Sequence, residues 1–330
     1  MGTLMDSKIT RRTFLVHGSA CMASAWLPSA LSAPDYPARP VTIVVPYGPG
    51  SFMDTVTRPF AVALQKSLGQ PVIIDNKGGA SGVIGTQSAA RANPDGYTLL
   101  VGSTSTLAAN VGLFRNLPYD PLKDFVPVAG IASTSMILLI SASSPHRDLK
   151  SFLGDAGRQQ KPLAMGYGSA SAQVALAQLT QVSGVEFVGV PYKSSPQAVT
   201  DLLGGQVSAV LVDLSNGMPH VRSGSLVALS ISGQRRSLAA PDVPTLSEVY
   251  PGTELVTWVG LVAVKNTPEA VLVRLGRAAK EALAMPQVKD QFTALAADIE
   301  PMSSETLGNI MESDQKKWLS LIEAAHIEPM

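Results

Sequence analysis

Residues 40–58, Pro-Val-Thr-Ile-Val-Val-Pro-Tyr-Gly-Pro-Gly-Ser-Phe-Met-Asp-Thr-Val-Thr-Arg, decide the fold at the start of this chain. The run 41–45 is rich in β-branched residues, which is typical of a buried parallel strand. Pro46 ends that strand because proline cannot donate to the sheet ladder. The glycines and proline of 47–50 predict a tight turn, and Ser51 can cap a helix. The stretch therefore predicts a strand, a loop and a helix in succession.

A helix that begins beside the carboxyl end of a strand presents unpaired N–H groups and the positive end of its dipole. This arrangement suits an anionic ligand above the sheet. A plain connection between strand and helix, with no ligand, is the alternative that this stretch by itself leaves open.

Composition narrows the class of protein. The chain has 330 residues, of which 45% are hydrophobic and 15% charged, as in globular proteins. This length allows one large or two ordinary domains. The formal net charge is zero, so there is no electrostatic basis for binding nucleic acid.

The N-terminal segment has the pattern of an export signal. Arg11 and Arg12 lie in a twin-arginine pattern, an apolar stretch follows, and residues 30–33 offer a small-residue cleavage site. We interpret 1–33 as a cleaved signal, which predicts a periplasmic mature protein. Cys21 lies within it, so the mature chain would contain no cysteine and no disulfide. No later stretch has the apolar length of a membrane span, so the mature protein is expected to be soluble.

The rest of the chain predicts an α/β fold. Three strand–loop–helix units follow one another through residue 110, each with small or hydroxyl-bearing residues after its strand. The same theme restarts after the long apolar run 128–142 and continues to about residue 250. A second apolar run, 256–264, precedes helical patterns at 268–325. We expect two domains, 34–129 with 255–330 and 130–254, joined by two crossing strands around a cleft.

Motifs for catalysis are missing. Gly48, Gly50 and Met53 fail the dinucleotide fingerprint at its third glycine. No G-x-S-x-G nucleophile motif occurs. The histidines of the mature chain are too far apart to suggest a metal site. The sequence therefore predicts a binding protein that is not an enzyme and needs no cofactor or metal, and Trp258 and Trp318 are expected to be packing residues.

Several ordered motifs resemble those of one family. They are 36–51 with its Val-Val-Pro-Tyr-Gly-Pro-Gly-Ser ending, Ala-Asn-Pro-Asp-Gly-Tyr at 92–97, Val-Pro-Tyr-Lys at 190–193, Asp-Leu-Leu-Gly-Gly-Gln-Val at 201–207, Ala-Pro-Asp-Val-Pro-Thr at 240–245 and Trp-Val-Gly-Leu at 258–261. Together they resemble the extracytoplasmic solute receptors of the tripartite tricarboxylate transporter, or Bug, family over essentially the whole mature chain. The resemblance implies a two-domain periplasmic binding protein that closes on a small carboxylated metabolite and delivers it to a membrane permease.

Three positions depart from the family's usual pattern. Ser51 stands where the family's usual Pro-Gly-Gly has its second glycine, and Gln173 stands where histidine is common in the family. Pro59 falls inside the expected first helix. A proline there costs about 3 kcal/mol unless the helix is kinked or begins late. These departures bear on the ligand and leave the expected fold unchanged.

The cleft loops supply the candidate ligand-binding residues. They carry hydroxyl groups and backbone amides and almost no cations, Lys77 being the one lysine at their edge. Asp213 ends a strand where the family commonly has an acid, although a helix cap is an alternative role for it. The predicted site comprises Tyr47, Gly50, Ser51, Phe52, Ala80, Ser103, Ser105, Ser169, Ala170, Ser171, Gln173 and Asp213.

The leading prediction is a monomeric receptor for an organic acid that works with permease subunits and binds no nucleic acid. A ligand-sensing domain for a signalling partner and an exported enzyme are the alternatives.

Overall fold

The structure is a computed structural model, and it describes Gly2 and residues 36–330. The predicted export signal at 1–33 therefore lies outside the described residues, apart from Gly2.

The first lobe is built on a mixed sheet. Three parallel strands stand in the order β2-β1-β3, and β9 and β4 extend them in antiparallel fashion. The expected parallel order is thus correct for the first three strands, and the sheet as a whole is mixed. The bounds are β1 Val41–Val45, β2 Val72–Asn76, β3 Thr98–Ser103, β4 Phe125–Ser141 and β9 Val256–Val264, with the two-residue β10 Asp298–Ile299 beside β4.

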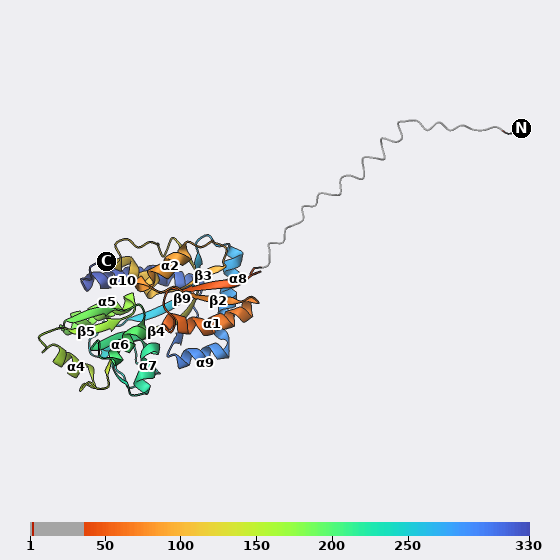
Figure 1. Cartoon of the computed structure of the whole chain (residues 1–330). Coiled ribbons are helices and arrows are strands. Elements are labelled where there is room, and N and C mark those ends of the chain that lie inside the picture. Colours follow the sequence, from red (N-terminus) through yellow and green to blue (C-terminus); the bar gives the residue numbers. More distant parts are fainter. Residues whose placement is uncertain (1, 3–35) are drawn as a thin grey trace. The chain divides into compact units, whose positions relative to one another are not determined.

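Helices cover both faces of this sheet, as Figure 1 shows. Ile43 and Val44 are neighbours on β1 but belong to different core clusters, since side chains alternate across a strand. The cluster with Ile43 contains α1, α8 and α9, and the cluster with Val44 contains α2 and α10. The bounds are α1 Phe52–Leu68, α2 Val83–Ala90, α8 Glu269–Ala284, α9 Pro286–Ala294 and α10 Ser304–Ala324.

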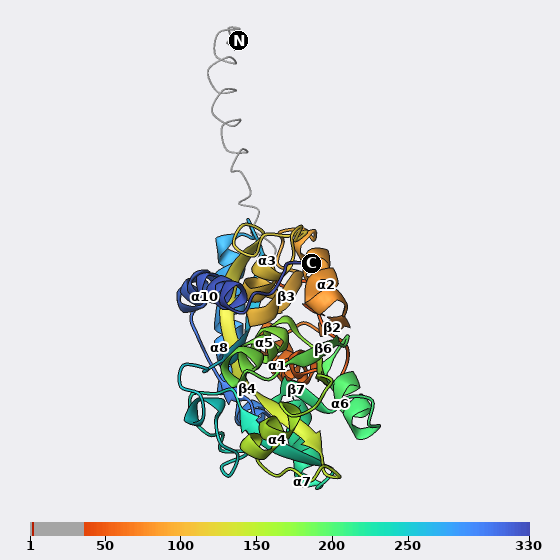
Figure 2. The same cartoon turned by 90° about the vertical axis from the view of Figure 1, so that its left-hand side faces the viewer.

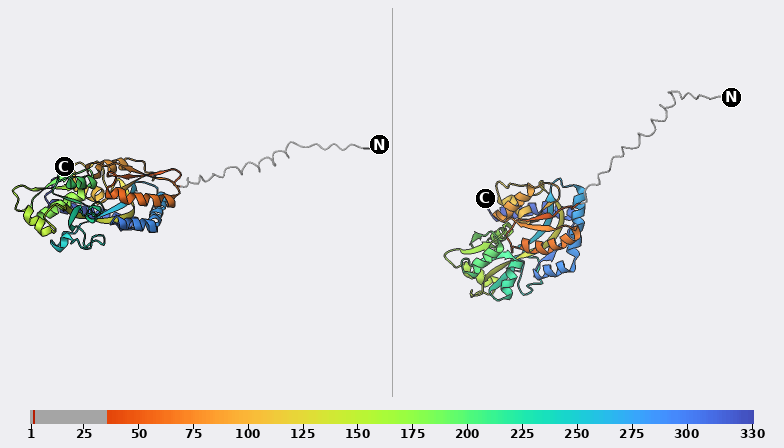
Figure 3. Two further views of the ribbon diagram at one scale, coloured as in Figure 1. Left: turned by 60° about the horizontal axis from the view of Figure 1, so that its bottom comes forward. Right: turned by 45° about the vertical axis from the view of Figure 1, so that its right-hand side comes forward.

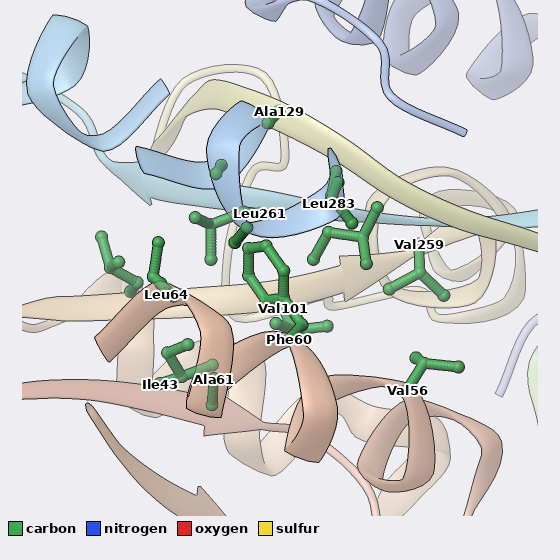
Figure 4. Packing of buried hydrophobic residues seen from close by; sticks show 14 of the residues in the cluster. Ile43, Val56, Phe60, Ala61, Leu64, Val101, Ala129, Val259, Leu261 and Leu283 are labelled. Atoms are coloured by element: carbon green, nitrogen blue, oxygen red, sulfur yellow. The ribbon is translucent and has the colours of Figure 1, made fainter. Parts of the chain in front are cut away.

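Figure 4 shows the larger of these clusters. Phe60 and Leu64 on α1 reach toward the sheet residues Val101 and Leu261, and Leu283 on α8 closes the cluster from the other side. All of these side chains are at most 2% exposed. Full burial of each such side chain contributes about 1.5–3 kcal/mol.

The second lobe repeats the arrangement. Its parallel strands β7, β5 and β6 lie beside the far half of β4, which also pairs with β8. Helices α4 and α5 cover one face, and α6 and α7 cover the other. The bounds are β5 Leu163–Tyr167, β6 Phe187–Pro191, β7 Ala209–Asp213, β8 Leu226–Ile231, α4 Leu149–Ala156, α5 Ala170–Ser183, α6 Ser195–Leu203 and α7 Leu214–Arg222.

Strand β4 belongs to both lobes. Residues 125–135 pair with β9 in the first sheet, and in the second sheet residues 136–140 pair with β7 and residues 137–141 with β8. Strand β9 begins at the boundary between the two lobes. Directly before it, the N–H of Leu255 donates a hydrogen bond to the carbonyl of Ser232 at 2.7 Å. Figure 3 shows the green elements of the second lobe gathered apart from the orange and blue elements of the first, and in Figure 2 the second lobe, with α4, α5 and α7, faces the viewer.

The first helix, strand β4 and the two tryptophans bear on local predictions from the sequence. The first helix begins at Phe52 and continues through Pro59, so it does not begin late. Strand β4 begins at Phe125, three residues before the apolar run that predicted it. Trp258 and Trp318 are 5% and 1% exposed and belong to core clusters, which confirms their expected packing role.

Candidate functional site

A cavity lies between the two lobes, where the carboxyl ends of strands from both sheets meet. Its walls come from the loops after β1, β3, β5 and β7, from the start of α6 and from β9. Its volume is about 30 Å³, which is room for water molecules only. The lining residues are Tyr47, Ser51, Phe52, Met53, Ser103, Ser105, Gly168, Ser169, Ser171, Ser195, Asp213, Thr257, Trp258 and Val259.

Four helices begin at this cavity. Ser51 caps α1 by accepting a hydrogen bond from the N–H of Asp54 at 3.3 Å, and Ser169 caps α5 by accepting one from Ala172 at 3.3 Å. Ser195 is the first residue of α6, and Asp213 directly precedes α7. Each helix N-terminus carries unpaired N–H groups and about half a positive charge. The four helix N-termini therefore contribute a positive potential at the cavity.

The loop after β1 is held by a buried carboxylate that sequence reasoning missed. Asp54 is 2% exposed and accepts from the N–H of Gly50 at 2.9 Å, from Asn76 Nδ2 at 3.0 Å and from Arg58 Nε and Nη2 at 2.9 and 2.8 Å. Asn76 Nδ2 also donates to the carbonyl of Tyr47 at 3.1 Å. A signal for this network was present in the sequence, because Ser-x-x-Asp at 51–54 is a capping-box pattern.

Tyr47 is 4% exposed, and burial raises its pKa to about 12, with the neighbouring hydroxyls of Ser105 and Ser103 opposing the shift. Its hydroxyl donates to the carbonyl of Ser81 at 3.3 Å. The glycine-rich loop packs behind it: a Cβ atom on Gly82 would lie 2.6 Å from the methyl carbon of Thr106 and 3.3 Å from the tyrosine hydroxyl. Only glycine allows this close approach.

The two lobes touch each other directly across the cavity. The hydroxyl groups of Ser105 and Ser171 lie 2.9 Å apart, and the N–H of Ser171 donates to Ser105 Oγ at 3.2 Å. Asn216 Nδ2 donates to the carbonyl of Gly50 at 2.9 Å. The Ser103 hydroxyl is buried and has no hydrogen-bond partner in the described part. The lobes are thus closed on each other, and the cavity between them has room for water molecules only.

Asp213 is the charged side chain of this cavity, since no lysine, arginine or histidine lines it in the described part. The residue as a whole is half-buried, but its carboxyl lies inside the cavity, and burial raises its pKa. Ser195 Oγ donates to Asp213 Oδ2 at 3.1 Å. The side chain makes no capping hydrogen bond to α7. Lys77 lies elsewhere, paired with Asp75 at 3.0 Å.

The structure brings most of the predicted residues together. Four of them lie outside the lining: Gly50 at the contact with Asn216, Ala170 behind Ser169 in the core, Gln173 one turn into α5, and the exposed Ala80 in the loop behind Tyr47. The prediction did not include Met53, Gly168, Ser195, Thr257, Trp258 or Val259, which line the cavity. Thr257 to Val259 belong to the apolar strand β9, and nothing in its sequence pattern indicates which of its residues face the cavity.

Neither a membrane-spanning helix nor a metal site is found among the described residues. No helix among them is long and apolar enough to cross a membrane. No group of histidine, cysteine, aspartate and glutamate side chains is placed to hold a metal ion there.

Comparison with known proteins identifies the fold and the class. Residues 56–327 match the model of the tripartite tricarboxylate transporter family receptor. Protein BugT of Bordetella pertussis is 34% identical over 305 residues, covering 91% of this chain and 94% of BugT. MatC from Rhodopseudomonas palustris, solved with bound malate, superposes with a TM-score of 0.83 at 32% identity, over 87% of this chain and 100% of MatC.

Rpa4515 of R. palustris, solved with adipate, has a TM-score of 0.86 at 27% identity over 90% of this chain and 100% of its own. These relatives confirm the two-lobed binding-protein fold, and the family consists of solute-binding receptors rather than enzymes. Because the family model and a relative above 30% identity both span most of the chain, this protein belongs to the tripartite tricarboxylate transporter family of receptors and is a periplasmic solute-binding receptor.

Proposed function

We propose that the cavity between the lobes binds the carboxylate of a small organic acid and that the protein delivers this acid to permease subunits of a tripartite transporter. The observation that carries the proposal is the convergence of the N-termini of α1, α5, α6 and α7 on a cavity with no lining cation. Backbone N–H groups and helix dipoles can hold an anion there without a salt bridge.

Hydroxyl groups complete the proposed site. Ser51, Ser105, Ser169 and Ser171 line the cavity from both lobes, so one carboxylate between them would contact both sheets. The bound malate and adipate of the relatives support this ligand class. The direct contact between Ser105 and Ser171 lies where such a ligand would stand, so ligand binding replaces a contact between lobes with contacts to the acid.

Delivery to a permease and export by the twin-arginine route are further parts of the proposal. The family relationship supports the first, and Arg11-Arg12 in the sequence supports the second. We expect the receptor to act as a monomer, because one chain contributes every wall of the cavity.

Thermal unfolding of residues 34–330 in the presence of organic acids tests the binding proposal. An acid at 100 times its Kd is expected to stabilise the fold by about 2.7 kcal/mol. The fully amidated forms of the same acids are the matched control, because a primary amide has nearly the shape of a carboxylate and lacks its charge. Equal shifts with the acids and their amides, or no shift with any acid, would contradict the proposal. Uptake of the identified acid by cells with the permease, with and without the receptor, tests delivery.

A further inference from the structure

The charges of the cavity predict more than a carboxylate site. Asp213 and Tyr47 are the titratable groups that line it in the described part, and the raised pKa of Tyr47 keeps its phenol neutral. Asp213 therefore decides the charge that the lining side chains present. A carboxylate of the ligand held near Asp213 would meet a like charge, and two carboxylates that share a site do not both ionise readily.

The Asp213 carboxyl is placed to accept hydrogen bonds from a ligand. Its Oδ2 accepts from Ser195 Oγ at 3.1 Å, which is the side chain's one hydrogen bond to another residue in the described part. An ionised carboxylate has about four acceptor sites, so most of them remain for a ligand. Since the side chain does not cap α7, the carboxyl is free to face the cavity.

The packing around Ser195 holds this pair in place. Ser195 is 4% exposed at the start of α6. A Cβ atom on Gly168 would lie 2.4 Å from the backbone nitrogen of Ser195, so the loop after β5 is packed directly against it. The position of the Ser195 hydroxyl, and through it that of the Asp213 carboxyl, is set by two loops of the second lobe.

We propose that Asp213 and Ser195 form a donor-recognition subsite, through which this receptor prefers acids with a single carboxylate and an amide, hydroxyl or ammonium donor over di- and tricarboxylates. This inference rests on the proposed function, because it assumes that a carboxylate is bound at the helix N-termini. The ligand then lies with its carboxylate among the serine hydroxyls and its donor group at Asp213.

Matched ligand pairs test the subsite. In succinate and succinamate, and in adipate and adipamate, one ionised carboxylate is exchanged for a neutral amide of the same shape. Titration calorimetry with the wild type is expected to show the monoamide of the better-fitting pair binding about tenfold tighter than its dianion. Asp213→Asn is expected to abolish or invert this ratio, because it removes the repulsion and keeps the shape.

Two further variants control the experiment. Asp242→Asn makes the same charge change in an exposed loop of the second lobe and is expected to leave the ratio unchanged. Ser195→Ala frees the carboxyl from its hydrogen bond and is expected to reduce the ratio without abolishing it. The thermal unfolding midpoint of each variant shows whether it is folded.

The pH dependence of affinity has opposite signs for the two ligand classes. A dianion near Asp213 favours the protonated carboxyl, so its affinity rises as pH falls. A ligand with an ammonium donor, such as 4-aminobutanoate, favours the ionised Asp213 carboxyl, so the affinity for this ligand decreases as pH falls. A dianion that binds more tightly than its monoamide, or a ratio that is the same in Asp213→Asn, overturns the subsite while the proposed function stands. If no acid binds at all, the proposed function fails and the subsite with it.

Discussion

Asn216 Nδ2 donates a hydrogen bond to the carbonyl oxygen of Gly50 at 2.9 Å and so joins the second lobe to the loop after β1. Asn216 is not part of the cavity lining, and its Oδ1 atom is buried without a partner in the described part. The contact stabilises the closed arrangement at a point that a bound acid does not have to touch.

Asn216→Ala is therefore expected to shift the ligand-free protein toward an open arrangement. A net hydrogen bond contributes about 1 kcal/mol, so the ratio of closed to open molecules should fall about fivefold. Small-angle scattering without ligand is expected to show a larger radius of gyration for Asn216→Ala than for the wild type. Saturation with an acid that binds should bring the radius of the variant to that of the wild type with the same acid. Asn309→Ala, exposed on α10, is the control. A radius that is the same in both variants would show that the contact does not hold the lobes closed.

Asp54 is expected to be the most sensitive carboxylate of the first lobe. Asp54→Ala removes the acceptor of the Gly50 N–H and one of the two acceptors of the Asn76 amide, whose bond to the Tyr47 carbonyl remains. A buried donor left without an acceptor costs about 1–3 kcal/mol. Asp75→Ala is a matched control, because Asp75, which pairs with Lys77, is 40% exposed and the ion pair should contribute less than about 1 kcal/mol. Urea unfolding of both variants measures the difference, and equal losses would contradict the assigned role of Asp54.

Single serine changes in the cavity are expected to weaken acid binding by tens of fold at most. Hydrogen bonds to an ionised group contribute about 1.5–3 kcal/mol each, and the backbone donors remain after Ser171→Ala. Ser183→Ala, at the other end of α5, is the control and should bind as the wild type does. Calorimetric Kd values test this, and a complex in which an arginine makes a bidentate bond to the acid would refute the proposed mode of recognition.

Asp213→Asn is expected to stabilise the ligand-free protein at neutral pH. Burial raises the folded-state pKa of Asp213 above its unfolded value, so the ionised carboxyl opposes folding above that pKa. The advantage of the Asn variant should shrink as pH falls through the folded pKa and vanish below the unfolded pKa, where both states are protonated. Denaturant unfolding across pH measures it. A constant difference at all pH values would mean that the charge is not its cause.

Replacement of Arg11 and Arg12 by lysine is expected to block export, since the arginine pair is the signature of a twin-arginine signal. Arg39→Lys, in the mature chain, is the control. Fractionation of cells locates the protein in each case. Normal periplasmic accumulation of the double variant would show that the general secretory route is used instead.

The amino-acid sequence by itself determined the local elements. Strand β9 matches the apolar run 256–264 at both ends, and Ser51 caps the helix that it was expected to cap. Such features depend on neighbours within a few residues, through β-branched side chains, proline and capping hydroxyls. The ordered family motifs extended this to the two-lobed fold, because they span nearly the whole mature chain.

Only the tertiary structure decided which residues face the cavity. Ser195 follows β6 and Asp213 ends β7, and the two meet because both strands pair with β5. Asn216 meets Gly50 because the lobes close. Ala80 is adjacent to a predicted ligand loop in sequence, yet it is exposed behind Tyr47, since the backbone turns left-handed at φ 47° and 51° for Ala80 and Ser81. These contacts join residues far apart in the chain or depend on a backbone conformation that L residues rarely adopt, so no local pattern announces them.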